Sequence, residues 1–263
     1  MGFLAALLYA LLMNGIPLAA VIYTGGSPAV LLLLYWFETV FMVVTGAIRI
    51  VLHRRATAKA GHYVASSTSS HKDSTAASVR AALGRENDFL KGFLGITVIF
   101  TIAHGVFVLL LVFLFKIAGP VSWEDARWAL NYVIVVQGLY LLWDLPQLRG
   151  WSFARLSTSV GSVGIRVLVT QLGLIFGLAG AGMTGSAWGL VGTFVVMRAL
   201  CDAMIAGLQG FVKRRDLPPG LARFLSKQSK QSVESLEAEF DALKRDGTEV
   251  EALLERPIGD LRR

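Results

Sequence analysis

Residues 27–55 read SPAVLLLLYWFETVFMVVTGAIRIVLHRR, and this stretch decides the fold class. From Pro28 to Leu52 the residues are mostly apolar, over more than the roughly 20 residues that a transmembrane helix needs. A carboxylate, Glu38, interrupts the run, and the adjacent Arg54 and Arg55 follow it. The stretch therefore predicts a membrane-spanning helix that carries a charge near its middle.

The composition agrees with this prediction for the whole chain. The 263 residues are 54% hydrophobic and 16% charged, whereas a soluble domain has about 25% charged residues. The net charge of +7 comes from residues at the ends of apolar runs, so it does not indicate nucleic-acid binding. The single cysteine, Cys201, cannot form an internal disulfide and fits no metal-site spacing. We expect no metal and no cofactor.

Six apolar segments are long enough to span a bilayer, and together they predict an all-α helical bundle. They are Phe3–Tyr23, Pro28–Leu52, Phe89–Ile117, Ala129–Leu145, Gly161–Ala181 and Ala187–Phe211. The first lacks a basic leader and is longer than a signal-peptide core, so we interpret it as a retained span. Residues 1–212 thus form a six-span transmembrane domain with a polar loop at about 53–88, and residues 213–263 form a tail.

Lysine and arginine residues near the span ends predict the orientation of the bundle. The basic residues between spans two and three, between spans four and five, and after span six are Arg54, Arg55, Lys59, Arg80, Arg85, Lys91, Arg149, Arg155, Lys213, Arg214 and Arg215. The opposite side has Lys116 and Arg127 beside acidic residues. Both termini are therefore expected in the cytoplasm.

The tail changes from basic to acidic along its length. Residues 213–230 are basic and contain apolar positions that suit a short helix lying on anionic membrane lipids. From Gln231 the tail is acidic, with apolar residues at helical spacing, and Thr248 with Glu251 is typical of a capping box before Pro257. Two interpretations stay open: a helical hairpin packed on the protein's own cytoplasmic face, or a docking element over 231–256 for a cytoplasmic protein or a second copy of the chain.

Ionisable residues inside the predicted spans are the main candidates for function. Glu38 follows Pro28 by ten residues, or about 15 Å along a helix, which is close to mid-bilayer. Arg198 has nearly the same depth in span six, and Asp202 follows it one helical turn later. Arg166 and His104 lie within spans five and three. A charge at the centre of a span costs roughly 2.5–3.5 kcal/mol, so these groups must face inward and be paired or hydrated.

We predict one buried polar centre made of Glu38, His104, Arg166, Arg198 and Asp202. In this hypothesis Arg198 bridges the two carboxylates, Arg166 reaches Asp202, and His104 hydrogen-bonds Glu38. In an alternative, Arg166 extends to the inner interface and Asp202 pairs with Arg198 alone. The four formal charges sum to zero in both arrangements.

Four further polar residues are secondary candidates: Asn14, Gln137, Asp144 and Gln171. Asn14 stands near Pro17, where a proline kink with a satisfied amide is the simplest interpretation. The glutamines are typical of interhelical hydrogen bonds, and Asp144 of an interfacial position. No catalytic residue is assigned, because Ser186 lacks the surroundings of an intramembrane serine nucleophile. An enzyme is the less favoured interpretation.

The motifs resemble a group of prokaryotic multi-pass membrane proteins classified as a domain of unknown function. They are Tyr35-Trp36-Phe37-Glu38 on span two, His104-Gly105-Val106-Phe107 on span three, Arg166 on span five, and Arg198 with Asp202 on span six. The resemblance covers roughly Leu31 to Gly207 and implies a prokaryotic plasma membrane, but no reaction. It departs at Thr39, where the group often has asparagine, and in early span three, where Gly95-Ile96-Thr97 replaces an aromatic-rich polar motif.

Two functions are consistent with these residues. In the first, the chain is a small transporter, channel-like or proton-relaying protein that uses the polar centre. In the second, it is a structural membrane scaffold with an ion-pair network and a partner-binding or dimerising tail.

Overall fold

The computed structural model describes residues 17–19, 21–23, 25–63, 89–116, 118–212 and 248–261, with the backbone alone for 204–212 and 260–261. The helices are α2 (Pro28–Thr57), η1 (Ala60–Tyr63), α4 (Phe89–Leu109), η2 (Leu110–Leu114), α5 (Trp123–Asp144), η3 (Leu145–Gly150), α6 (Phe153–Thr184), α7 (Ala187–Val212) and α10 (Ile258–Leu261). Over these residues the fold is all-helical, as predicted.

Four helical stretches are long and apolar enough to cross a membrane. They are Pro28–Thr57, Phe89–Leu114, Trp123–Gly150 and Phe153–Thr184. These stretches identify the chain as a membrane protein. The predicted first span, Phe3–Tyr23, lies mostly outside the described residues, as do most of the polar loop and residues 213–247.

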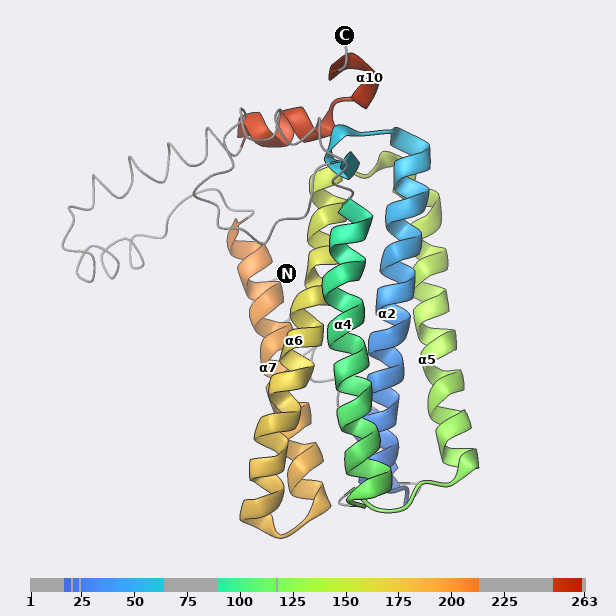
Figure 1. Cartoon of the computed structure of the whole chain (residues 1–263), viewed down its shortest axis with the longest axis vertical. Coiled ribbons are helices and arrows are strands. Elements are labelled where there is room, and N and C mark those ends of the chain that lie inside the picture. Colours follow the sequence, from blue (N-terminus) through green and yellow to red (C-terminus); the bar gives the residue numbers. More distant parts are fainter. Residues whose placement is uncertain are drawn as a thin grey trace, which may run out of the picture.

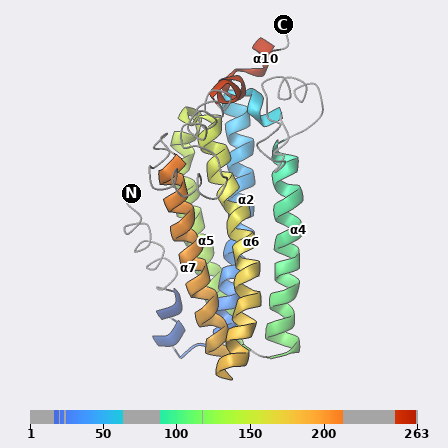
Figure 2. The same cartoon turned by 90° about the vertical axis from the view of Figure 1, so that its left-hand side faces the viewer.

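The long helices run antiparallel in one bundle, with α2 at its centre (Figures 1 and 2). α2 packs against α4, α5, α6 and α7, and α6 and α7 form a tight hairpin. The first eight residues of α2, 28–35, are all buried.

Because the helices alternate in direction, one end of the bundle contains the ends of α2 and α5 and the starts of α4 and α6. The C-terminal helices lie at this same end (Figure 1). We call this the cap end.

Two predicted spans begin several residues later than the helices that contain them. The fourth, predicted as Ala129–Leu145, begins at Trp123, because the side chain of Ser122 accepts a hydrogen bond from the Asp125 backbone at 3.0 Å and caps the helix. The fifth, predicted as Gly161–Ala181, begins at Phe153. The first turns of both helices contain polar residues, so the apolar pattern on which the prediction rested begins later than the helix itself.

Glycines permit the close approach of α6 and α7. A Cβ built at Gly177 would lie 2.7 Å from the carbonyl oxygen of Leu190, and one at Gly189 would lie 2.7 Å from that of Gly180. Gly173 instead faces the ring of Phe194. These small residues let the two backbones come into contact, and any larger residue at Gly177 or Gly189 would push them apart.

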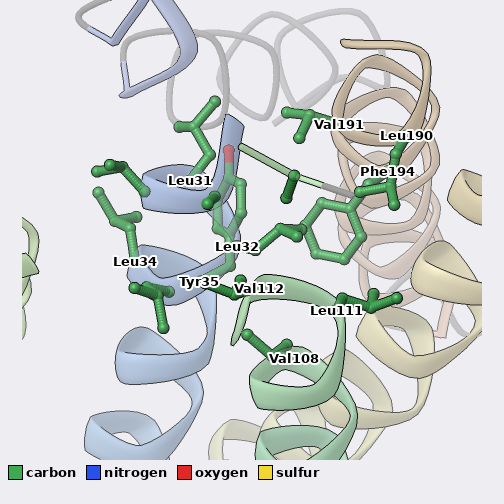
Figure 3. Close-up of a cluster of buried hydrophobic side chains, with 14 of the residues drawn as sticks. Leu31, Leu32, Leu34, Tyr35, Val108, Leu111, Val112, Leu190, Val191 and Phe194 are labelled. Carbon is green, nitrogen blue, oxygen red and sulfur yellow. The ribbon is translucent and has the colours of Figure 1, made fainter. Parts of the chain in front are cut away.

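Two apolar clusters fill the bundle. The first lies away from the cap end, and Figure 3 shows its side chains from α2, α4, η2 and α7 around the rings of Tyr35 and Phe194, whose centroids are 5.1 Å apart. The second lies toward the cap end and includes Ile50, Phe93 and Leu156. The charged residues Glu38, Arg166, Arg198 and Asp202 lie on α2, α6 and α7, which also contribute to these clusters.

Candidate functional site: a buried ion-pair centre

Glu38 and Arg198 form an ion pair between the central helix α2 and α7. The distance from Arg198 Nη2 to Glu38 Oε2 is 2.6 Å, within hydrogen-bonding range. The Arg198 side chain is 6% exposed and that of Glu38 is 22% exposed. The guanidinium also lies 4.4 Å from the ring centroid of Tyr35, so it is held by a carboxylate and an aromatic face together. Arg198 is thus the residue that compensates the charge of Glu38.

Arg166 and Asp202 form a second pair between α6 and α7. Arg166 Nε lies 3.1 Å from Asp202 Oδ1. The Arg166 side chain is 37% exposed, against 14% for Asp202. The angle is unsuited to a hydrogen bond from that nitrogen, so Nε contributes to an ion pair without donating a hydrogen bond.

The four predicted charges therefore come together from three helices as two pairs. Arg198 acts electrostatically on Asp202 as well as pairing with Glu38. Negative and positive groups therefore alternate in the order Glu38, Arg198, Asp202 and Arg166. Of the two sequence hypotheses, only the first places Arg166 against Asp202, and that contact is present.

His104 belongs to the same centre, but its contact differs from the one we predicted. The side chain is buried to 1% exposure on α4 and lies within electrostatic range of Arg198. Its hydrogen-bond partner is the side chain of Gln171, not Glu38. Gln171 Nε2 donates to the Phe100 carbonyl at 3.0 Å, which leaves the amide oxygen to accept from the imidazole. Gln171 is thus the interhelical hydrogen bonder that the sequence indicated.

The second ring nitrogen of His104 faces the interior without a hydrogen bond. Nδ1 is buried and has no partner in the described part of the chain. Because Nε2 serves the Gln171 contact, we assign the proton to Nε2 and a free lone pair to Nδ1. The hydroxyl of Thr101, one turn earlier on the same face, and Nη1 of Arg198 are likewise buried without partners among the described residues. Three polar atoms of this centre are left with unused hydrogen-bonding capacity.

Other threonines on the buried faces are satisfied within their own helices. Thr39 donates to the Tyr35 carbonyl at 2.9 Å, Thr97 to Phe93 at 2.7 Å, and Thr170 to Arg166 at 2.7 Å. This bonding adds polar groups to the core at little cost. It also makes Thr101 distinct, because its hydroxyl alone of these four lacks such a bond.

Two tyrosines at the centre were not identified from the sequence. Tyr35 lies under Arg198, and Tyr132 of α5 is within electrostatic range of Glu38. The sequence contained a signal for Tyr35, because it stands three residues before Glu38, about one helical turn, and so lies on the same side of α2. No short-range pattern connects Tyr132 with Glu38, because α5 is far away in sequence.

Packing of α2 on α4 fixes the depth of Glu38 relative to His104. Trp36 Nε1 donates to the Thr101 carbonyl at 3.3 Å. A Cβ built at Gly105 would lie 2.6 Å from that same Nε1, so the glycine makes room for the indole. The aromatic-Trp-aromatic-Glu and His-Gly motifs are therefore two sides of one helix contact.

Asp144, a secondary candidate, belongs to a separate pair near the cap end. Arg49 of α2 contacts Asp144 Oδ2 through Nε at 2.9 Å and Nη2 at 2.8 Å. Arg49 lies three helical turns beyond Glu38 in residues 27–55 and was not among the residues predicted to form the polar centre. The side chain of Gln137 forms no hydrogen bond or ion pair with any part of the chain that the structure describes, and Asn14 lies outside the described residues.

Within the described residues, no group of three or more His, Cys, Asp or Glu side chains is placed to hold a metal ion. The centre is instead a set of ion pairs, one imidazole and hydroxyl groups. Such groups can bind polar partners and take up or release protons.

Comparison with known proteins gives the chain a family. No curated protein and no solved structure matches it. A family model matches residues 3–222, which include every residue of the polar centre and stop short of the C-terminal helices. The resemblance to a domain of unknown function is thereby confirmed: the chain belongs to the family of unknown function DUF6498.

Proposed function

We propose that this protein relays protons, or passes a small polar solute, through the centre formed by Glu38, His104, Arg166, Arg198 and Asp202. The observation that carries the proposal is the buried Nδ1 of His104, a basic nitrogen without a hydrogen-bond partner among the described residues. An apolar or fully bonded side chain would serve packing better at this place, because an unsatisfied buried polar atom costs about 1–3 kcal/mol. Intramembrane ionisable groups commonly mark proton or ion pathways.

The atoms around His104 suit a short relay. Nδ1 can take up a proton while Nε2–H stays bonded to Gln171, and the hydroxyl of Thr101 on the same helix face can donate or accept. Glu38 is 22% exposed despite its ion pair, so its carboxylate keeps access to a neighbour other than Arg198. A proton on Glu38 would weaken its pair with Arg198 and free the guanidinium to turn toward Asp202. This step is the proposed gate.

The proposal includes a topology of six spans, with both termini in the cytoplasm of a prokaryotic cell and the chain in its plasma membrane. The basic residues Arg54, Arg55, Arg149 and Arg155 all belong to the cap end, which supports this orientation. Single cysteines on a Cys201→Ser background, tested with a membrane-impermeant thiol reagent on intact cells, would locate each end. Labelling of a cysteine at exposed Arg55 from outside the cell contradicts the proposed orientation.

Proton flux tests the relay directly. Purified protein in liposomes with an imposed pH gradient and a pH-sensitive dye inside should dissipate the gradient faster than empty liposomes. We expect His104→Gln and Glu38→Gln to lower that rate at least tenfold, because each removes a titratable group. Asp144→Asn is the matched control: it neutralises a carboxylate in an ion pair of similar length outside the centre. If liposomes with wild-type protein dissipate the gradient no faster than empty liposomes, the protein does not relay protons, and passage of a polar solute is tested next.

A structural scaffold is the second candidate, and one observation favours it. The four charges sum to zero and pair at 2.6 and 3.1 Å, as ion pairs that select which helices pack together also do. Under this proposal, flux is absent and the working surface is the tail, with lipids, a second copy or a cytoplasmic protein bound through 231–256. Light scattering of full-length and tail-deleted protein in detergent would test the oligomer.

A further inference from the structure

The C-terminal segment 253–258 is seated on the cap end by backbone bonds, and we call it the clasp. Lys59 and Pro257 form an isolated antiparallel bridge. Ala60 N donates to the Arg256 carbonyl at 2.8 Å, and Ile258 N donates to the Ala58 carbonyl at 3.0 Å. In Figure 1 the C-terminal helices lie across the end of the bundle next to η1. The clasp thus adds a short strand-like contact to the turn that follows α2.

Side chains reinforce the clasp at two points. Glu255 pairs with Lys59 at 2.5 Å, and its other oxygen accepts from the backbone of Ala154 at 3.2 Å. Ala154 lies in the first turn of α6, where a carboxylate is favoured by the helix dipole. Leu253 is 4% exposed. This part of the tail packs on the protein's own surface, which is the first of the two interpretations left open above.

A buried histidine pair shares a backbone carbonyl with Lys59, the lysine that pairs with Glu255; we call the Lys59–Glu255 ion pair the anchor of the clasp. His53 Nδ1 and His62 Nε2 are 2.7 Å apart, and both side chains are fully buried. His53 Nε2 lies 3.1 Å from the carbonyl oxygen of Trp151, and Lys59 Nζ donates to that same oxygen at 2.9 Å. One carbonyl therefore connects the histidine pair to the lysine that holds Glu255. Both histidines fall within the predicted polar loop, about 53–88, whereas His53 lies in α2 and His62 in η1.

The hydrogen bonds fix where the protons are. A carbonyl oxygen can accept only, so His53 carries its proton on Nε2 and donates it to Trp151. Nδ1 of His53 is then an acceptor, and His62 donates from Nε2. One added proton can be accommodated, because the bond between the rings needs one donor and one acceptor. Two added protons leave two facing donors, and the bond is lost.

Charges around the pair oppose a second proton. Lys59 and Glu255 both act electrostatically on His53, with opposite signs, and they form an ion pair with each other. Arg54 of α2 is stacked over Tyr63 at 4.7 Å, and Arg155 of α6 over Trp151 at 4.4 Å. The ring of Phe153 lies edge-on to His62, and Phe89 packs edge-on to Phe153. Two imidazolium groups here would be adjacent to each other and buried, with Lys59 close by, which is strongly unfavourable.

We propose that the clasp is an acid-sensitive switch, in which protonation of both His53 and His62 separates the rings, disturbs the Trp151 carbonyl and Lys59, and releases segment 253–258 from the cap end. The proposal stands independently of proton relay. An exposed imidazole takes up its proton near pH 6.5, and removal from water shifts this to lower pH. The clasp should be closed at pH 7–8 and open as the pH falls below about 6.

The test measures the distance between the clasp and α2. Nitroxide labels are placed on Arg55→Cys and Glu251→Cys, both at exposed positions, in full-length Cys201→Ser protein in lipid nanodiscs. Electron–electron double resonance on frozen samples should give one narrow distance at pH 8. Between pH 7 and 5.5 a broad, longer population should grow, with the open-to-closed ratio rising at least tenfold and with the steepness of a two-proton event. A wild-type distribution that stays narrow to pH 5.5 overturns the proposal.

Two variants assign the effect. His62→Gln keeps a donor toward His53 but cannot be protonated, so it should stay closed across the range; opening with the wild-type profile would overturn the role of the histidines. Glu255→Gln weakens the anchor and should be partly open already at pH 8, which shows that the labels report on the clasp. If His62→Gln is already open at pH 8, this variant gives no answer, and the steepness of the wild-type pH profile decides whether two protons open the clasp. A one-proton profile centred in the carboxyl range, near about pH 4.3, would implicate Glu255 and contradict the proposal.

Discussion

Two ion pairs on α2 join the same chemical groups at two depths of the bundle. Glu38 with Arg198 lies in the middle, at 2.6 Å, and Arg49 with Asp144 lies toward the cap end, at 2.8 Å. The carboxylates are almost equally exposed, at 22% and 23%. The arginines differ: Arg198 is 6% exposed and stacks on Tyr35, whereas Arg49 is 11% exposed. The two ion pairs therefore have similar distances, but the arginine of the middle pair is more buried and lies against an aromatic ring.

The comparison teaches that depth, not distance, decides what such a pair does. Near the edge of the membrane, a separated charge can reach water or lipid headgroups. In the middle it has neither, so the partner is its main source of stabilisation. A pair at mid-depth is thus costly to break and suited to gating, while a pair at the edge mainly positions helix ends.

The largest effect should follow from breaking the middle pair. We expect Arg198→Met to lower the free energy of unfolding by roughly 3–5 kcal/mol, because it leaves Glu38 unpaired in the bundle. Adding Glu38→Gln should restore most of this loss. Thermal unfolding in detergent, followed by fluorescence of the tryptophans, would measure both.

The double variant distinguishes coupling from two separate defects. If its loss equals the sum of the two single losses, Glu38 and Arg198 are not energetically coupled, and the contrast between the two depths fails. If Glu38→Gln alone is as stable as the wild type while Arg198→Met is not, the carboxylate is unnecessary for packing. A role in proton movement then gains support.

An intermediate effect should come from packing beside the middle pair, without any change of charge. Gly105→Ala places a methyl group against Trp36, so we expect a loss of about 1–3 kcal/mol. Gly138→Ala on α5 is the matched control, because a Cβ there meets nothing within 4 Å. Equal melting temperatures for the two variants would mean that α2 and α4 separate easily and that Trp36 does not fix the depth of Glu38.

The smallest effect should come from the edge pair. We expect Asp144→Asn to cost about 1 kcal/mol or less, since Arg49 can extend to the interface once it is free. Chemical unfolding in mixed micelles is sensitive enough to resolve it. A loss as large as that of Arg198→Met would show that a separated charge finds no more water at the cap end than in the middle, so that the two pairs do not differ in this respect.

Sequence reasoning found the charged members of the centre because hydrocarbon restricts them so strongly. A carboxylate such as Glu38 inside an apolar run must have a partner, and Arg198 at equal depth was the natural choice. The same reasoning failed for Arg49, which looked like one more basic residue near a span end. It also failed for His104, because Gln171 competes for the ring nitrogen, and the choice depends on side-chain geometry.

Contacts that join distant segments could not be predicted from local pattern. His53 and His62 stand in a polar stretch that suggested a loop, yet α2 continues to Thr57 and the turn after it folds back, so that both rings are buried. Their burial depends on Trp151 and Phe153, almost a hundred residues away in the sequence. Helix periodicity carries no information on such a meeting.

The π-helix η2 has a consequence for how chains of this family align. Phe115 N donates to the Leu110 carbonyl at 2.8 Å, a bond that spans five residues where an α-helix spans four. The segment thus holds one residue more than an α-helical path of equal span. A family member that lacks one residue here would keep His104 and Gly105 in register with α2, and its difference would be confined to the chain between η2 and α5. A single-residue gap at 110–114 in a family alignment would therefore be a marker of the π-helix, not of a shifted polar centre.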